Sequence, residues 1–579
     1  MTGSMGRSQG GDPLSGGASA TVIAGRWTRL PFPARHSTLS LIAKVGSYAA
    51  IAIGVALRVL QLLANRSLSQ DEAQLALNIM HRSLSGLFRP LDFLQGAPAG
   101  FLVLQNLAVE TLGDHEYSFR LVSFVAGTLA VVLILFLAQE TLAPAAVPLA
   151  VLLFAVSDPL ITWTVYAKPY ALDVLVAIVI LWFGLRVLHQ PNSLAPIVLL
   201  AGAGVAAIWL SNPSVFVLAG VSTALVGGAL VRKEWRRGAT LSLASVAWLS
   251  SFAVFAFTYL HNLSSFQSLD CASCFAKGGS PGSSESLSGI HSLRDSFGEF
   301  RYVAGVPHFL DYRGNDLGLL VFLVAIGFCV LGLRSLAGRQ PEAALMLLAP
   351  LIFMLIAWML HKYPTLGRTQ LFLVPNFVLL LGEGTAYAVL TVRRTYGRAL
   401  IAICSVVIAV AIAAPSFGHI ANPRSFEDLK PVLGHLAKRQ RPGSTLYLYY
   451  TAQYQFRYYL ECGCGGAAFE SARKSGLWPL KPGAAGRDLF APALRSVPPR
   501  LIVAKYRDRD PSHYISDFDA LRGKKSVWFL LSSLENPRRT RPFLLEQLDR
   551  RGTQRVAFVI GKGKGAAGLY LYDMTQSGR

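Results

Sequence analysis

The apolar stretch LSLIAKVGSYAAIAIGVALRVLQLLA occupies residues 39–64 and is long enough to cross a hydrocarbon core of ~30 Å. The 579-residue chain is 53% hydrophobic and only 15% charged, with a mean hydropathy of +0.43. These values exclude a soluble enzyme and predict an α-helical polytopic membrane protein. Hydropathy and loop charge together predict about eleven transmembrane helices, near residues 39–64, 117–138, 143–161, 170–188, 194–211, 213–231, 239–260, 317–333, 342–360, 370–391 and 399–415.

Basic residues gather in alternate loops between the predicted helices, and this pattern orients the chain. By the positive-inside rule these loops are cytoplasmic, and so is the Gly/Ser-rich tail of residues 1–37, which we expect to be disordered. The transmembrane domain then covers residues 38–416, and the loop 261–316 and everything after residue 416 lie outside. The basic clusters are Arg26, Arg29 and Arg35; Arg232, Lys233, Arg236 and Arg237; Arg334 and Arg339; and Arg393, Arg394 and Arg398.

The first apolar stretch could instead be a cleaved signal peptide. We reject this alternative because the stretch is long, carries Lys44 and Arg58, and has no convincing small-residue cleavage site. The net charge of +22 is attributed to basic cytoplasmic loops that meet anionic lipid headgroups. No nucleic-acid partner is therefore expected.

The six cysteines divide between the predicted spans and the outside. Cys329 and Cys404 lie in spans and are expected to be small core residues. The other four lie in segments placed outside, where disulfides persist, and are disulfide candidates with the pairing left open. Zinc is a weaker alternative, since neither pair has a histidine neighbour. These four are Cys271, Cys274, Cys462 and Cys464.

Residues 417–579 change composition and alternate strand-like with helical segments. Such alternation predicts a small extracytoplasmic α/β domain. The glycine- and lysine-rich segment 561–565 lacks the spacing of a phosphate-binding loop and is interpreted as a hairpin turn. The expected strands cover 446–450, 501–506, 527–531 and 556–560, and the expected helices cover 452–460 and 541–550.

Asp71 and Glu72 follow the first predicted span directly. Carboxylates beside a membrane span are costly if they face lipid, so a functional role is the first interpretation. The alternative is structural: Ser69 as the N-cap of a helix and Glu72 at its third position would form a capping box.

Further polar residues stand at the outer ends of later spans, where a lipid-phosphate headgroup would lie. Each also has a structural interpretation: Glu116 and Arg120 could pair on a helix surface, Lys168 and Arg368 could extend to the interface, and the tyrosines could belong to an aromatic belt. Because all of them fall on one face, a shared site is favoured. The set comprises Asp92, Gln95, Glu116, Arg120, Lys168, Tyr170, Asp173, Tyr363 and Arg368.

Five motifs in this order resemble those of the GT-C glycosyltransferases, in the branch of protein O-mannosyltransferases and lipid A aminoarabinose transferase. They are Asp71-Glu-Ala73, Pro90-Leu-Asp-Phe-Leu-Gln-Gly-Ala-Pro98, Glu116-Tyr-Ser-Phe-Arg120, Ala167-Lys-Pro-Tyr-Ala171 and Tyr363-Pro-Thr-Leu-Gly-Arg368. The resemblance covers about residues 40–415. It implies a GT-C-like fold and a polyprenyl-phosphate-linked sugar donor. It also implies transfer to an envelope glycan, lipid or protein on the outer face of the bacterial cytoplasmic membrane.

The resemblance maps the family's first-loop Asp to Asp71 and its second acidic position to Glu116. Lys168 stands where many relatives carry arginine, which keeps the charge but loses a bidentate fork.

Transfer from a lipid phosphate needs a base for the acceptor proton and cations for the leaving phosphate. We assign Asp71 as the base. A single displacement at the anomeric carbon of the sugar would invert the configuration of that carbon. Glu72 and Glu116 either orient the cations or help Asp71 hold a divalent metal ion. The expected substrate-binding residues are Gln95, Arg120, Lys168, Tyr170, Tyr363 and Arg368.

The alternative function is a transporter or flippase of lipid-linked sugars. It would require polar residues at mid-membrane depth and repeat symmetry, and neither is clear in the sequence.

Overall fold

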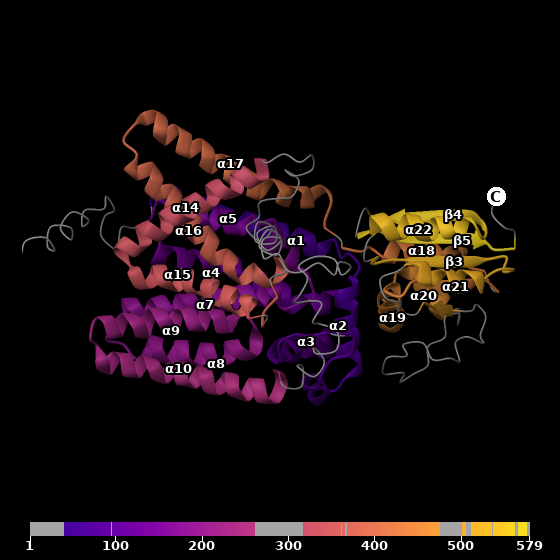
Figure 1. Ribbon diagram of the computed structural model, residues 1–579, viewed down its shortest axis with the longest axis horizontal. Coiled ribbons are helices and arrows are strands. Elements are labelled where there is room, and N and C mark those ends of the chain that lie inside the picture. Colours follow the sequence, from indigo (N-terminus) through magenta and orange to yellow (C-terminus); the bar gives the residue numbers. More distant parts are fainter. Residues whose placement is uncertain are drawn as a thin grey trace, which may run out of the picture.

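The computed structural model describes residues 40–93, 95–260, 317–360, 362–364, 367–424, 426–441, 443–474, 501–504, 511–534, 537–561 and 565–575. It consists of a large helical bundle and a smaller domain with a β-sheet, joined by an extended linker (Figure 1). The predicted fold class, a polytopic helical protein with a small C-terminal α/β domain, is confirmed.

Within the described ranges, nine helices are long and apolar enough to cross a membrane. A tenth candidate is the pair α5 (Val147–Ala155) and α6 (Asp158–Thr164), which is bent by 49°. The run predicted at 194–211 forms α8 (Ala195–Leu210), which at 16 residues is shorter than a full span. Each of the eleven predicted runs therefore contains a helix. The nine are α1 (Leu41–Leu63), α4 (Glu116–Thr141), α7 (Tyr170–His189), α9 (Ser214–Val231), α10 (Trp235–Phe255, continued by η2, Ala256–Leu260), α14 (Leu317–Arg339), α15 (Pro341–Met359), η4 with α16 (Gly367–Leu373 and Val374–Thr391) and α17 (Thr395–Ala421).

Glycines allow two of these spans to touch backbone to backbone. A Cβ at Gly332 of α14 would collide with the carbonyl of Leu380, and one at Gly384 of α16 with the carbonyl of Phe328. Small residues are the usual means of close helix approach in membranes. The α14–α16 contact therefore depends on glycine at both positions.

The break between α5 and α6 is compensated by side chains from other helices. Arg58 of α1 is 1% exposed, and its Nη1 donates to the carbonyls of Gly54 (2.9 Å) and Ala155 (2.8 Å). Ser416 of α17 donates to the carbonyl of Val156 (2.5 Å). Carbonyls freed by a break inside a membrane need such partners, and this explains a charged residue within the first span.

Three shorter helices lie between the first long helix and α4 along the chain. They are α2 (Gln70–His81), η1 (Leu84–Phe88) and α3 (Ala99–Leu112). Figure 1 shows α2 and α3 at the end of the bundle nearest the C-terminal domain, and α19 of that domain packs against α2.

The C-terminal domain is built on a five-stranded sheet in the order β2-β1-β3-β5-β4. Strands β2, β1 and β3 are parallel, and β5 is antiparallel to both of its neighbours. Its elements are α18 (Lys430–Arg439), β1 (Thr445–Leu448), α19 (Ala452–Cys462), α20 (Ala467–Lys474), β2 (Leu501–Val503), η6 (Pro511–Tyr514), α21 (Ile515–Asp519), β3 (Val527–Leu531), α22 (Pro537–Asp549), β4 (Thr553–Ile560) and β5 (Ala567–Asp573).

Each of the four expected strands and both expected helices overlap an observed element, but β5 was not expected. The last span, α17, continues to Ala421, so the boundary placed at 416/417 falls inside this helix. The hairpin expected at 561–565 lies largely outside the described residues.

Candidate active site

Asp71 and Arg368 form an ion pair at the end of the bundle that carries α2. Asp71 occupies the first turn of α2 and Arg368 belongs to η4, 297 residues later. Nη1 of Arg368 lies 3.1 Å from Oδ2 of Asp71, and about a third of each side chain is exposed. The guanidinium also lies 5.9 Å from the centre of the Tyr170 ring, in cation–π range. Three of the predicted site residues are thus brought together where a ligand could reach them.

Glu72, although next in sequence, is buried and fully engaged by the protein. It is 1% exposed, and it forms the capping box with Ser69 that was the structural alternative. One carboxylate oxygen accepts from the Ser69 amide (2.9 Å), and the other accepts from the Ala167 amide (2.9 Å) and Nε of Arg120 (3.4 Å). Glu72 therefore ties α2 to the turn that carries Lys168.

Arg120 is also buried, at 5% exposure, and it holds the loop before α2. Its Nη1 donates to the carbonyl of Arg66 (2.7 Å) and its Nη2 to that of Ser67 (3.1 Å). With Nε on Glu72, each nitrogen of the guanidinium has a protein acceptor. The geometry makes Arg120 a support of the site, and its predicted role toward a phosphate stays a prediction.

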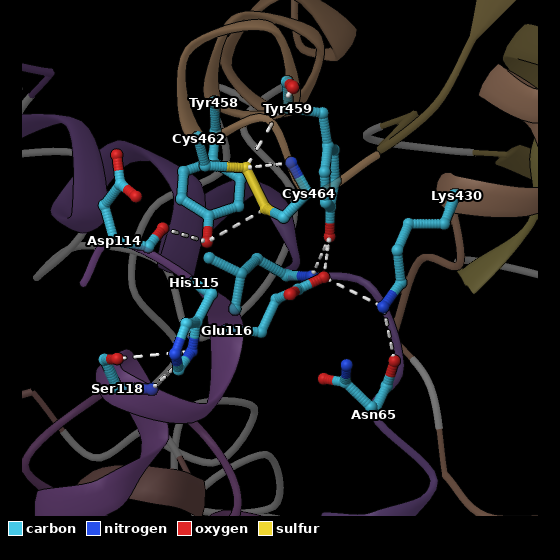
Figure 2. Close-up of a disulfide and its surroundings, with 11 residues drawn as sticks. Asn65, Asp114, His115, Glu116, Ser118, Lys430, Tyr458, Tyr459, Cys462 and Cys464 are labelled. Carbon is cyan, nitrogen blue, oxygen red and sulfur yellow. Dashed lines mark hydrogen bonds and ion pairs between the residues drawn. A yellow bond between two sulfur atoms is a disulfide. The ribbon is translucent and has the colours of Figure 1, made fainter. Parts of the chain in front are cut away.

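Glu116 lies beside Tyr459 and Lys430 of the C-terminal domain (Figure 2). It is 3% exposed and pairs with Lys430 at the start of α18 (2.8 Å) rather than with Arg120. The hydroxyl of Tyr459 in α19 donates to the same carboxylate (3.4 Å). Glu116 thus joins the start of α4 to α18 and to α19.

Lys168 lies in the turn between α6 and α7 and is 5% exposed. Its ammonium donates to Oε1 of Gln95, and Nε2 of Gln95 donates to Oε1 of Gln74 in α2 (2.8 Å). Burial lowers the pKa of Lys168 to about 8, with the Asp71 carboxylate acting against this shift and the Arg368 cation adding to it. Lys168 and Gln95 are therefore brought together as predicted, within electrostatic range of the Asp71–Arg368 pair.

An aromatic layer supports the charged residues. The Trp163 ring packs edge-on against Tyr166 (4.7 Å) and Tyr170 (5.0 Å), and Phe426 of the linker lies within 5.3 Å of Trp163. The Tyr166 hydroxyl is hydrogen-bonded to Oγ of Ser69 (2.5 Å). Burial raises the pKa of Tyr166, and nearby Asp71 and Glu72 raise it further, so this hydroxyl stays protonated.

Tyr363 braces the loop before Arg368 instead of entering the cluster directly. Its hydroxyl donates to the carbonyl of Thr369 (2.8 Å), and its ring packs edge-on against Phe216 (4.9 Å). Burial raises the pKa of this hydroxyl as well.

A polar cavity opens between the loop before α2, the α6–α7 turn and the linker. Its lining includes three arginines, and each is paired with a carboxylate: Arg66 with Asp428, Arg120 with Glu72, and Arg424 with Asp158. The three arginines of this lining are thus neutralised by carboxylates, as Arg368 is by Asp71.

The linker supplies residues that the sequence analysis missed. Glu427 accepts a hydrogen bond from the Gln70 amide at the start of α2 (2.9 Å). Asp428 accepts from Arg66 (2.8 Å) and from the Ser67 hydroxyl (2.7 Å). A signal was available, because this acidic doublet follows the last span just as Asp71 and Glu72 follow the first.

The described residues contain no group of three or more His, Cys, Asp or Glu side chains placed to hold a metal ion. The candidate ligands Asp71 and Glu116 each face a cation of the protein. This arrangement does not fit a divalent metal, and we assign no catalytic step to one.

A disulfide joins Cys462 and Cys464 at the end of α19 (Figure 2), which is one of the pairings left open by the sequence. Close to it, the Tyr458 hydroxyl donates to the carbonyl of Asp114 just before α4 (3.1 Å). Cys271 and Cys274 lie outside the described residues. Cys329 is buried in α14, as expected, and Cys404 is partly exposed in α17.

Residues 97–259 match the family model of dolichyl-phosphate-mannose-protein mannosyltransferases. This match confirms the resemblance to GT-C glycosyltransferases that the motifs indicated. The matched segment contains Glu116, Arg120, Lys168 and Tyr170. No protein with a curated function matches the sequence.

Solved structures of similar fold include ArnT from Cupriavidus metallidurans bound to undecaprenyl phosphate, with 14% identity, 92% of this chain and 98% of that chain covered, and a TM-score of 0.48. The Archaeoglobus fulgidus oligosaccharyltransferase in complex with zinc and sulfate has 13% identity, covers 92% of this chain and 73% of its own, and has a TM-score of 0.47. The mycobacterial arabinofuranosyltransferase AftD has 15% identity, covers 94% and 40%, and has a TM-score of 0.35.

Proposed function

We propose that this membrane protein is an inverting glycosyltransferase that moves a sugar from a polyprenyl-phosphate donor to an envelope glycan, lipid or protein. Transfer takes place on the outer face of the bacterial cytoplasmic membrane. The observation that carries the proposal is the Asp71–Arg368 ion pair, with Lys168 and Tyr170 beside it. The matched family is named for a lipid-phosphate sugar donor, which supports the donor class.

In the proposed mechanism, the donor phosphate binds Arg368 and Lys168 and competes with Asp71 for the guanidinium. Asp71 is thereby released to accept the proton of the acceptor. The acceptor atom attacks the anomeric carbon, the bond from that carbon to the phosphate oxygen breaks, and the polyprenyl phosphate leaves with the electron pair. Arg368 and Lys168 stabilise the charge on the leaving phosphate, and the weak basicity of that phosphate removes the need for a strong acid.

The decisive experiment measures the transfer of sugar from purified polyprenyl-phosphate hexose or pentose donors to an envelope acceptor, catalysed by the wild-type protein in nanodiscs. Mass spectrometry of envelope glycans and glycolipids, from cells with and without the protein, identifies the acceptor. Asp71→Asn should abolish most transfer while donor binding persists. The matched control is Asp519→Asn, which removes a partly exposed carboxylate of α21 that lies outside the site and pairs with Arg522 and Arg551. Translocation of donor across liposomes without transfer would instead support a flippase.

The proposed orientation has its own test. Reporter fusions after Glu234 should be cytoplasmic, whereas fusions after Ser284 and Asp510 should be extracytoplasmic, because the basic loops fix the orientation. A cytoplasmic fusion at 510 would contradict both the orientation and the outer location of the site.

A further inference from the structure

The linker between the last span and the C-terminal domain is bound tightly to the loop before α2. Asp428 accepts from the backbone amide and the hydroxyl of Ser67 (3.3 and 2.7 Å), and the Lys430 amide donates back to the same hydroxyl (2.8 Å). The Lys430 ammonium also donates to the carbonyl of Asn65 (2.6 Å), as Figure 2 shows. Residues 426–430 are therefore a fixed part of the site's wall.

Within this segment, Glu427 is held beside Asp71. Its Oε2 accepts from the amide of Gln70, the residue immediately before Asp71. Two carboxylates thus meet at the N-terminus of one helix, one from the helix itself and one from a segment more than 350 residues later. Glu427 is partly exposed, and the Ser533 side chain lies beside its carboxylate.

The two carboxylates differ in their partners. Asp71 is paired with Arg368, whereas no lysine or arginine of the described segments forms an ion pair with Glu427. The nearby cations are engaged elsewhere: Arg66 pairs with Asp428 and Lys430 with Glu116.

The charges that act on Glu427 are therefore mainly negative. Burial is the main cause that raises the pKa of Glu427 to about 7; the Ser533 side chain and the Gln70 amide oppose the rise, and the carboxylates of Asp71 and Glu72 contribute to it. A carboxyl group that changes protonation near neutral pH is suited to proton transfer.

We propose that Glu427 is a second carboxylate of the active site, which pairs with Asp71 in taking up the proton released by the acceptor. In this scheme the acceptor's proton passes to the carboxylate pair as the new glycosidic bond forms and the bond to phosphate breaks. The pair then releases the proton to solvent. The assignment rests on the proposed function for its catalytic meaning, but the coupling between the two carboxylates is a property of the protein alone.

The kinetic test compares the pH dependence of kcat in wild type, Glu427→Gln and Glu427→Asp. Glutamine keeps an oxygen for the Gln70 amide and removes only the charge, so kcat should fall about tenfold or more, and the acidic limb of the profile should move to lower pH. Aspartate should restore part of the rate. Glu546→Gln, which removes an exposed carboxylate on α22 paired with Arg550, is the matched control and should leave the profile unchanged. If the acidic limb of the pH profile of kcat is the same in Glu427→Gln as in wild type, the proposal is overturned.

A second measurement needs no activity and separates this proposal from the proposed function. Infrared titration of the wild-type protein should show a carboxyl group that deprotonates near neutral pH and is missing in Glu427→Gln. In Asp71→Asn the same group should deprotonate at lower pH, because the neighbouring charge is gone. Absence of the band, or no shift in Asp71→Asn, would overturn the pairing. A protein that shows both effects but transfers no sugar would refute only the glycosyltransferase assignment.

Discussion

Asp71 and Glu72 are neighbours in sequence, yet they belong to two different regions of the molecule. Asp71 lies at a partly exposed surface with a single cation, while Glu72 lies in a buried network with Ser69, Arg120 and the Ala167 amide. Successive helical residues point about 100° apart, so one faces the candidate site and the other faces the interior. The comparison shows that two adjacent carboxylates can have different roles: one is exposed to a ligand, and the other stabilises the fold around it.

The largest expected effect follows from breaking the buried region. Glu72→Gln would place an amide NH2 group against N–H donors and leave Arg120 without its carboxylate. Removing one partner of a buried pair costs about 3–5 kcal/mol, so the variant should unfold at a much lower temperature. Thermal denaturation in detergent measures this effect. Asp71→Asn, the same chemical change one residue earlier, should lie within about 1 kcal/mol of wild type because its ion pair is partly exposed.

Catalytic activity, in contrast to stability, should depend on the exposed carboxylate of Asp71. Asp71→Asn should lower kcat about 10²-fold or more, the usual contribution of a positioned base, without a matching loss of donor affinity. Single-turnover transfer and donor binding in nanodiscs measure the two quantities. Near-normal turnover would remove Asp71 from the role of base.

Lys168 should connect donor binding to pH. Its pKa of about 8 means that the ammonium is present below pH 8 and is lost as the pH rises through this value. Donor affinity should therefore decline above pH 8 in the wild type, and Lys168→Ala should be weak at every pH. Lys168→Arg should retain its charge and abolish the decline. Isothermal titration with the donor lipid measures these curves, and identical curves for wild type and Lys168→Arg would contradict the assignment.

The smallest effect is expected at the disulfide. Cys462 and Cys464 close a very short loop, and the entropic contribution of so short a cross-link is about 1.5 kcal/mol. Both cysteines should resist alkylation until reduced, as should Cys271 and Cys274. The double variant Cys462→Ser/Cys464→Ser should melt only slightly below wild type. Free labelling of these cysteines in native membranes would contradict an oxidising location.

Local patterns in the sequence were sufficient for much of this architecture. Apolar run length predicted the spans, because each span must cross a layer of fixed thickness. The capping box was visible as Ser69 and Glu72 three residues apart. The convergence of Asp71, Lys168, Tyr170 and Arg368 was expected from topology, since all stand at or beside the ends of predicted spans.

The missed features depend on long-range contacts. Glu116 lies at helical spacing from Arg120, which predicted a pair between them. The observed partners of Arg120 are instead residues 66, 67 and 72, and no local sequence pattern predicts these contacts. Strand β5 is an exception, since in GLYLY at 568–572 leucine alternates with glycine and tyrosine, which is a local strand signal. The acidic doublet at 427–428 was visible, but the contact of Glu427 with the Gln70 amide joins residues 357 apart in sequence, so the doublet alone could not place it beside α2.

The contacts between residues 426–430 and the loop before α2 also have a consequence for the synthesis of the protein. The loop before α2 is synthesised early, but the groups that hold it, from Glu427 through Gln455 and Tyr459, emerge last. Until the final domain has folded, Leu68 lacks the hydrogen bonds that its backbone makes with Gln455 and Tyr459. A chain that ends after the last span would contain every membrane helix, but the loop before α2 would lack these contacts. Synthesis of the C-terminal domain, and not of the spans alone, is therefore needed to anchor the loop that precedes Asp71.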